Sequence, residues 1–394
     1  MLKMRILYND MRKIIRNVAI CMELNDFIEH GIARGIVRYA KQQNLWKLYG
    51  YGWMFRPLKD IEYWEGDGII ARIESQEDAD RFASLKVPIV DVAGAYDRKG
   101  ICRVLNDDKK TGAIAGGYLK KCGFKTAAFL GAADTGWSGK RKQGFAGAYG
   151  LREKELRIFE KPLTWWEELV QSNELSAWIE NLPFPLGIFA CNDTAGVKFT
   201  EQCRLLNIPV PGSAAILGVD NEDILCELSW PSLSSIRLDS EKIGYEAASL
   251  LDTLFQQEKG GSYSQYEVII PPGEISERES TRIFACDDPI VQKAVTFIRN
   301  NAQEGIQVSD VAEYAAASRR NLEKRFKHIM GKTPYEEIVH TRIEYAKNLL
   351  RRPEKTVAAV AEESGFGSLQ RFHAQFKSCT GSSPGKFRKI ILGR

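Results

Sequence analysis

The chain has 394 residues, of which 44% are hydrophobic and 27% are charged, and its formal net charge is +4 at pH 7. This composition excludes a disordered chain, and the length exceeds that of one ordinary core, so we expect two or three domains. No stretch approaches the roughly 18 consecutive apolar residues of a membrane span. The basic residues before Asn17 are not followed by the apolar segment of a secretory signal. We therefore expect a cytoplasmic, globular protein.

Charge is distributed unevenly along the chain. From Ala285 to the end there are 19 Lys and Arg against 12 Asp and Glu, whereas the first 284 residues hold 36 against 39. A basic carboxyl-terminal segment suits phosphate binding, although an ordinary solvated surface can carry the same surplus. The eight cysteines include no C-x-x-C pair and no Cys/His cluster with metal-ligand spacing. We therefore expect reduced cysteines and neither a metal nor another cofactor.

The first two thirds of the chain alternate short apolar runs with amphipathic stretches. The expected strands are 18–22, 47–51, 68–71, 88–91, 103–106, 127–130, 156–159, 186–190, 214–218 and 266–270. The expected helices are 28–42, 108–122, 140–149, 165–182, 194–206 and 241–256. This alternation predicts parallel sheets with helices on both faces, and two such runs predict two doubly wound lobes. A ligand then binds at the carboxyl ends of the strands, in the cleft between the lobes.

The last part of the chain contains an internal repeat, in which the stretch 306–327 reappears, altered, as 356–377. Residues 308–313 have their counterparts 49 residues later, whereas those of Leu322 and Phe326 lie 50 residues later. The second copy therefore has one residue more than the first between these two blocks, at the point where each unit is expected to turn. Each copy combines a short helix, a tight turn and a longer helix with apolar residues at i and i+4. This pattern predicts two helix-turn-helix units.

These patterns divide the chain into three parts. We expect a two-lobed α/β domain over 17–281, a polar, proline-containing linker over 282–288 and an all-α domain over 289–391. Between the two units, Pro334 begins a helix of about 17 residues, roughly 26 Å long. That length is comparable with one DNA turn of about 34 Å, so one chain could present two recognition helices to successive major grooves.

Motifs in both parts carry a resemblance to known families. The first part holds, in this order, Ala190-Cys-Asn-Asp193, Ile208-Pro-Val-Pro211, Ile216-Leu-Gly-Val-Asp-Asn221, Pro231-Ser-Leu-Ser-Ser-Ile236 and Arg278-Glu-Ser-Thr281. Together they resemble the LacI/periplasmic-sugar-binding sensor fold. The second part, with Gly365-Phe-Gly-Ser368 and the closing Pro384-Gly-Lys-Phe-Arg388, resembles the AraC-type DNA-binding domain.

The resemblance implies a type I periplasmic-binding-protein-like sensor joined to a double helix-turn-helix domain. In that sensor fold the chain crosses between the lobes three times, here near Lys125, Ser234 and Gln265. The implied function is that of a bacterial transcription regulator, an activator, that works as a homodimer with RNA polymerase. Its implied effector is a monosaccharide, with a pentose favoured and D-xylose as the first candidate.

A sugar site needs carboxylates, amides and guanidinium groups for the hydroxyls and an aromatic face for the C–H side. Asp193 and Asp220 each follow an expected strand, and the resemblance implies that Asp193 and Arg141 bind the sugar. Alternatively, Asp193 caps a helix, Asp220 serves a turn with Asn221, and Arg141 starts a solvated helix. Four weaker candidates are Trp137, Phe27, Asp107 and Trp53.

The second helix of the first unit exposes a cationic stripe at i, i+4 and i+7, formed by Arg320, Lys324 and Lys327. Arg320 and Lys324 can donate to guanine, and Glu323 can accept from cytosine. Arg319 and Arg325 are placed for phosphate contacts. Any one of these side chains could instead belong to a solvated helix face.

The second helix of the second unit is more neutral. Leu369 can contact a thymine methyl group and Gln370 can pair with adenine, with His373 beside them and with Arg371 and Lys377 nearer the DNA backbone. The two turns also differ, because the family usually has glycine where the first unit has Ala316. If that position requires a positive φ, alanine costs on the order of 1 kcal/mol.

Two other classes of function compete with a regulator. A sugar- or nucleotide-modifying enzyme is disfavoured because the chain has no G-x-G-x-x-G after a strand, no complete phosphate loop and no G-x-S-x-G. Only His30 of the four histidines lies outside the helical domain. A transport binding protein would need a signal peptide and no helix-turn-helix units. We therefore expect a regulator that is not an enzyme.

Overall fold

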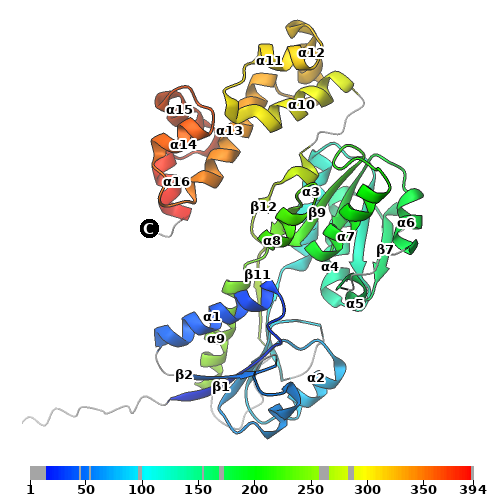
Figure 1. Cartoon of the computed structure of the whole chain (residues 1–394). Coiled ribbons are helices and arrows are strands. Elements are labelled where there is room, and N and C mark those ends of the chain that lie inside the picture. Colours follow the sequence, from blue (N-terminus) through cyan, green and yellow to red (C-terminus); the bar gives the residue numbers. More distant parts are fainter. Residues whose placement is uncertain are drawn as a thin grey trace, which may run out of the picture.

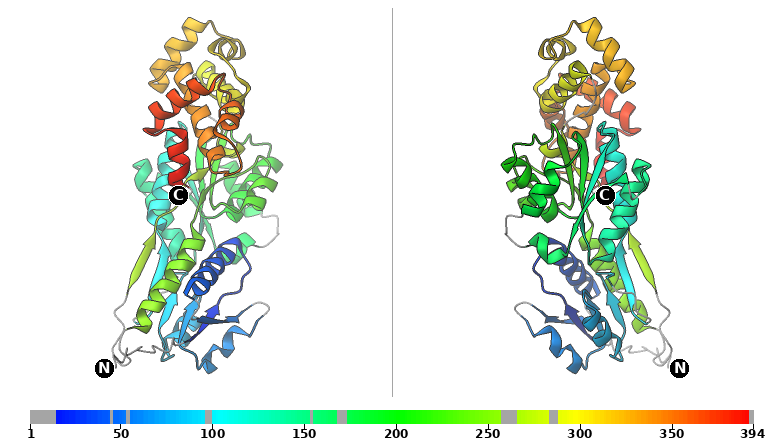
Figure 2. Two further views of the ribbon diagram at one scale, coloured as in Figure 1. Left: turned by 90° about the vertical axis from the view of Figure 1, so that its left-hand side faces the viewer. Right: turned by 90° about the vertical axis from the view of Figure 1, so that its right-hand side faces the viewer.

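The computed structural model describes residues 15–43, 46–52, 55–95, 100–152, 155–167, 173–256, 266–282 and 288–391. These residues form two α/β lobes and a helical domain (Figure 1). The side views in Figure 2 show that the three parts follow one another along one long axis. We call the two lobes the sensor and residues 288–391 the helical domain. Of the expected linker 282–288, residues 283–287 lie outside the described residues.

The first lobe is built on a six-stranded parallel sheet in the order β11-β5-β4-β3-β1-β2. The strands are β1 (Arg16–Cys21), β2 (Trp46–Tyr51), β3 (Gly68–Ala71), β4 (Ile89–Asp91), β5 (Cys102–Asn106) and β11 (Glu267–Ile270). The helices α1 (Phe27–Gln43) and α9 (Ser240–Phe255) share one core with the sheet. The helix α2 (Gln76–Ala83) and the 3-10 turn η1 (Leu58–Tyr63) share another. The sheet is therefore covered by helices over both faces, as the sequence predicts.

The second lobe holds the other six-stranded sheet, in the order β12-β10-β9-β8-β6-β7. Its strands are β6 (Ala127–Ala132), β7 (Arg157–Lys161), β8 (Leu186–Ala190), β9 (Ala214–Asp220), β10 (Ser234–Arg237) and the antiparallel β12 (Ile275–Ser276). Its helices are α3 (Asp108–Lys121), α4 (Gly136–Tyr149), α5 (Leu163–Glu167), α6 (Asn173–Glu180), α7 (Asp193–Leu205) and α8 (Asp223–Leu228). The 3-10 turn η3 (Glu279–Thr281) ends the sensor. The expected helix 165–182 corresponds to α5 and α6, and residues 168–172 lie outside the described residues.

The chain crosses between the lobes three times, but not where the sequence predicts. The first crossing is at Asp107, because α3 already packs in the core of the second lobe; the prediction near Lys125 is wrong. The second lies between β10 and α9, a few residues after Ser234. The third lies at 271–274, between β11 and β12, and not near Gln265, which is outside the described residues.

The helical domain contains seven α-helices within 288–391. They are α10 (Pro289–Asn301), α11 (Val308–Tyr314), α12 (Arg319–Met330), α13 (Pro334–Leu350), α14 (Val357–Glu363), α15 (Leu369–Thr380) and α16 (Pro384–Ile391), with the 3-10 turn η4 (Ala302–Glu304) after α10. One core surrounds Leu322 and Phe326, and a second surrounds Phe372 and Phe376. The two helix-turn-helix units are thus α11–α12 and α14–α15, which confirms the repeat.

The helix α13 joins the two units. It has 17 residues, begins with Pro334 and is capped by Thr333 and Glu336, each of which accepts from the other's backbone N–H. Ile338 packs in the core of the first unit, whereas Ile343 and its neighbours pack in the core of the second. One continuous helix therefore contributes to both cores.

Among the helices that the structure describes, none has the length and apolar character needed to span a bilayer. Over the same described residues, no three His, Cys, Asp or Glu side chains are grouped so that they could hold a metal ion.

Candidate ligand cleft and nucleic-acid interface

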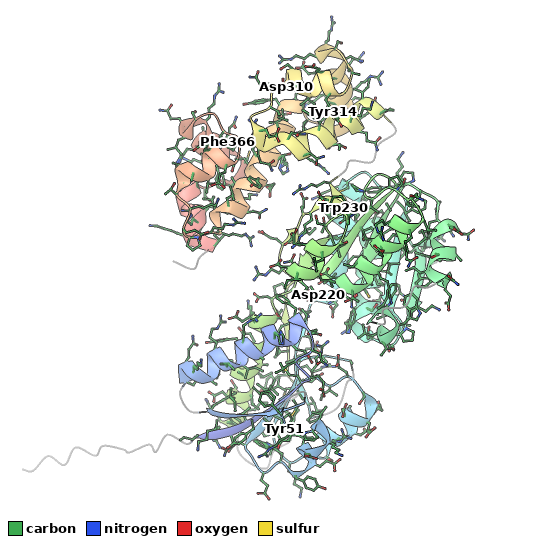
Figure 3. The ribbon with its side chains drawn as sticks, viewed as in Figure 1. Tyr51, Asp220, Trp230, Asp310, Tyr314 and Phe366 are labelled. Carbon is green, nitrogen blue, oxygen red and sulfur yellow. The ribbon has the colours of Figure 1, made fainter. Side chains whose placement is uncertain are left out.

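Asp220, at the end of β9, lies at the level where the two lobes face each other (Figure 3). Its Oδ1 is 4.0 Å from Nη1 of Arg141. Burial raises the pKa of Asp220 well above its ordinary value, and Arg141 opposes this shift. Asp26 raises and Arg72 lowers the same pKa, although both belong to the first lobe. Charged side chains of both lobes thus act electrostatically on Asp220.

The backbone at this point is strained. Asp220 has a φ of 108° and Asn221 a φ of 54°, in a region that side chains other than glycine rarely adopt. Each such residue costs on the order of 1 kcal/mol or more and persists only where its surroundings impose it. Here the Asn221 N–H donates to Oγ of Ser235 at 3.0 Å, and the Glu222 N–H donates to Oδ2 of Asp193 at 2.9 Å. Strain of this kind is typical of binding sites.

The buried Asp193 holds this turn in place through hydrogen bonds. It is 1% exposed, and it accepts from Oγ of Ser235 at 2.6 Å in addition to the Glu222 N–H and the thiol of Cys226. Burial raises the pKa of Asp193 to about 7. The alternative that Asp193 caps α7 is wrong, because Asn192 is the capping residue. Both carboxylate oxygens of Asp193 are engaged inside the second lobe, so its direct contact with a sugar stays a prediction.

Arg141 is 4% exposed and held from three sides. Its Nε donates to Oδ1 of Asp108 at 2.9 Å and its Nη1 donates to the Cys191 carbonyl at 2.5 Å. Its guanidinium carbon lies 4.6 Å from the centre of the Trp137 ring. Arg141 therefore does not start a solvated helix, and Trp137 is its stacking partner.

Close packing of α3 against α4 brings Asp108 to Arg141. A Cβ on Gly112 would lie 1.9 Å from the Arg141 carbonyl oxygen, and a Cβ on Gly144 would lie 1.9 Å from that of Lys109. Only glycine allows this approach at both positions. The carboxylate at the start of α3 thus fixes the guanidinium that faces Asp220.

The structure gives the surroundings of two weaker sugar candidates, and their contact with a sugar stays a prediction. The Phe27 ring, at the start of α1, lies 5.9 Å from the Arg34 guanidinium carbon and lines a pocket with the start of α9. Asp107 caps α3 by accepting from the Lys110 N–H at 3.0 Å. Trp53 lies outside the described residues.

The sequence analysis missed Asp26 and Arg72. Nη1 of Arg72 donates to Oδ2 of Asp26 at 2.8 Å and lies 3.5 Å from Oε1 of the buried Glu29. Arg72 directly follows β3, so the rule that placed Asp220 in the cleft applies to it equally. The position of Asp26 had no such signal, because four residues separate it from β1.

The outer face of α12 carries the expected cations. Arg320, Lys324 and Lys327 are exposed, and within the described residues their side chains have no hydrogen bond or ion pair. Glu323 accepts from Nε of Arg319 at 2.9 Å, so both are engaged within the helix. Nη1 of Arg325 donates to Oδ2 of Asp288 at 2.7 Å, at the start of α10. Arg320, Lys324 and Lys327 are therefore the exposed cations of α12 that stay available for the predicted DNA contacts.

The corresponding face of α15 is also exposed. It carries the five residues expected from the sequence, which are Leu369, Gln370, Arg371, His373 and Lys377. Phe372 and Phe376 hold its other face in the core of the second unit. Both second helices thus present polar stripes outward, and their contacts with bases stay predictions.

Known proteins resemble both the sensor and the helical domain. A model of the periplasmic binding protein-like domain matches residues 117–281, one of the XylR N-terminal domain matches 17–103, and one of a helix-turn-helix domain matches 311–390. The xylose operon regulatory protein of Escherichia coli (strain K12) is 28% identical over 95% of this chain and 97% of its own length. That of Haemophilus influenzae is 28% identical over 94% and 97%.

A solved structure of a xylose-binding transcription activator has a TM-score of 0.60 and 27% identity over 95% of this chain and 98% of its own. Because the match covers nearly all of both chains, the two proteins share the order of sensor and helical domain. These relatives are transcription regulators, which favours the regulator hypothesis over the enzyme and transport hypotheses.

Proposed function

We propose that this chain is a transcription regulator in which a monosaccharide bound between the two lobes controls binding to operator DNA. Its similarity to regulators that join a periplasmic-binding-protein-like sensor to a helix-turn-helix domain supports this. D-xylose is the first candidate, because the relatives that match the whole chain are named for xylose. The observation that carries the proposal is the strained turn at Asp220 and Asn221, where charges of both lobes act on Asp220.

The cleft offers the groups that a sugar needs. Asp220 can accept from hydroxyl groups, and the guanidinium groups of Arg141 and Arg72 can donate to them. Because Arg72 and Asp26 belong to the first lobe and Asp220 and Arg141 to the second, a bound sugar favours the closed arrangement. Closure changes DNA binding only if the sugar binds the DNA-competent arrangement better than the other.

The finer parts of the proposal concern partners. We expect the protein to act in the cytoplasm as an activator that contacts RNA polymerase, and to form a homodimer. A surface for the dimer is offered by α8, where Ile224 and Leu228 are 73% and 79% exposed one helical turn apart. Light scattering should find a dimer, and Leu228→Glu should shift it toward monomer; a wild-type monomer would refute this part.

The sugar site can be tested by calorimetry on the full chain with common aldoses. Asp220→Asn keeps the side-chain shape and removes the charge, so the favoured sugar should bind about tenfold or more weakly, as expected for lost hydrogen bonds to a charged group. Glu201→Gln, on the exposed face of α7, is the matched control and should leave binding unchanged. Unaltered titration of Asp220→Asn, or turnover of a sugar without DNA, would contradict the proposal.

A further inference from the structure

A cavity of about 650 Å³ lies between the sensor and the helical domain. The sensor contributes the region around β10, α8 and η3, and the helical domain contributes the end of α13, with Asn348, Arg351 and Arg352. Figure 3 labels Trp230, which lines this cavity on the side of the second lobe that faces the helical domain. Its volume is within the range of small-molecule sites, roughly 300–1,000 Å³.

Three of the four carboxylates that line this cavity form hydrogen bonds or ion pairs. Glu227 accepts from Nε of Arg278 at 2.7 Å. Glu274 forms an ion pair with Arg351 across the domain boundary. Glu279 accepts from the backbone N–H and the hydroxyl of Ser232 at 3.2 and 3.3 Å. The fourth, Glu277, acts electrostatically on Arg299, which does not line the cavity. The lining therefore holds five arginines against four carboxylates.

Three further arginines line the same cavity without such partners. Among the described residues, the side chains of Arg237, Arg282 and Arg352 have neither an ion pair nor a hydrogen bond. The charge of Arg237 also acts on Arg351, because burial and then Arg237 lower the pKa of Arg351. Cations of both domains are therefore held close together without a full set of counter-charges.

We propose that this cavity binds a small organic phosphate, held by Arg237 and Arg282 of the sensor and by Arg352 of the helical domain. Arginine forks match phosphate oxygens in geometry and bind them through paired hydrogen bonds. Trp230, with 74% of its surface exposed, offers an apolar face for the organic part. Such a ligand neutralises the facing cations and bridges the two domains.

The site is distinct from the sugar cleft and would act on a different joint. A sugar in the cleft closes the two lobes, whereas a phosphate in this cavity fixes the helical domain against the second lobe. Because Asn221 lines the cavity next to Asp220, the two ligands can also influence each other's affinity. The chain would then combine two chemical signals before it binds DNA.

Calorimetry on the full chain tests the proposal with inorganic phosphate and ribose 5-phosphate at constant ionic strength. Ribose 5-phosphate should bind in the wild type and equally in Asp220→Asn, which separates this site from the sugar cleft. Arg237→Gln and Arg352→Gln should each weaken its binding about tenfold, as expected for a lost charged hydrogen bond. Arg204→Gln, an exposed arginine of α7, should have no effect.

Three results would overturn the proposal. The first is no binding of either phosphate, and the second is binding that neither cavity variant weakens while thermal melting shows both to be folded. The third is displacement of ribose 5-phosphate by a short DNA duplex without an operator, which would assign the arginines to the DNA backbone. Tighter binding of ribose 5-phosphate than of inorganic phosphate would support the contribution of Trp230.

Discussion

The two helix-turn-helix units share one turn geometry but place it in different surroundings. The Ala316 N–H donates to the Glu313 carbonyl at 2.9 Å, and the Gly365 N–H donates to the Glu362 carbonyl at the same distance. Both residues are left-handed, with φ of 50° and 76°. The turn therefore requires a positive φ in both units, and the first unit meets this requirement with alanine.

The surroundings explain why only one unit keeps glycine. Ala316 is exposed, so its Cβ lies in solvent. A Cβ on Gly365 would lie 2.6 Å from the Ala302 carbonyl oxygen and 2.7 Å from that of Gln303. Those carbonyls belong to η4, in the first half of the domain. The second turn thus packs directly against the first unit. Close packing as well as the positive φ therefore requires glycine at position 365.

The largest effect on stability is expected where the packing of the second turn against η4 is disrupted. Gly365→Ala combines a left-handed alanine with two short contacts, so it should lower the free energy of unfolding by about 2–4 kcal/mol. Urea denaturation of the full chain measures this change. Gly367→Ala is the control, because its Cβ would meet nothing within 4 Å. Equal effects of the two substitutions would show that the contacts with η4 are unimportant.

The second comparison concerns what the units expose to DNA. The face of α12 carries Arg320 and Lys324, whereas the corresponding face of α15 carries Gln370. Lys324→Ala plus Gln370→Ala should relax sequence preference, at a cost of roughly 1–3 kcal/mol for each base-reading residue. A binding-site selection with the double variant checks this. An unaltered site profile would show that other residues read the bases.

The single variants separate the two units. Lys327→Ala should reduce the salt dependence of DNA binding, because it removes an exposed cation that can neutralise a phosphate, whereas Gln370→Ala should leave the salt dependence unchanged. Titrations at several salt concentrations measure both slopes. Equal slopes for the two variants would contradict a division of roles between the units.

The smallest effect is expected at the first turn. Ala316→Gly relieves the left-handed alanine but gives the unfolded chain more freedom, so the net gain should be about 0.5 kcal/mol. The same urea experiment measures it. A loss of stability would mean that the alanine Cβ makes a favourable contact at its exposed position.

Local patterns were enough to find most of the elements. The apolar runs gave β3 and β8 without error, and Pro334 gave the start of α13. The short elements α8 and β10 were not predicted, because their stretch of sequence has weak periodicity. That stretch contributed only to the family resemblance. Where a helix packs is a nonlocal property, so the sequence could not show that α3 belongs to the second lobe.

The candidate site was predicted in part for the same reason. Asp220 was placed by its position at a strand end, and the same rule would have found Arg72. Asp108 and Asp107 are neighbours, yet only Asp108 reaches Arg141, because the pitch of α3 decides which carboxylate turns toward α4. Asn192 and Asp193 are likewise neighbours with different roles. Asn192 caps α7, whereas Asp193 holds the strained turn by accepting from the Glu222 N–H.

The shared helix α13 sets the rotational phase of the two units. Since an α-helix turns about 100° and rises about 1.5 Å per residue, inserting one residue in α13 would rotate one unit far from the other while barely changing their separation. Two operator half-sites must then keep their helical phase as well as their distance. The two units therefore keep a fixed spacing and orientation relative to each other. The sensor can move them on DNA only together.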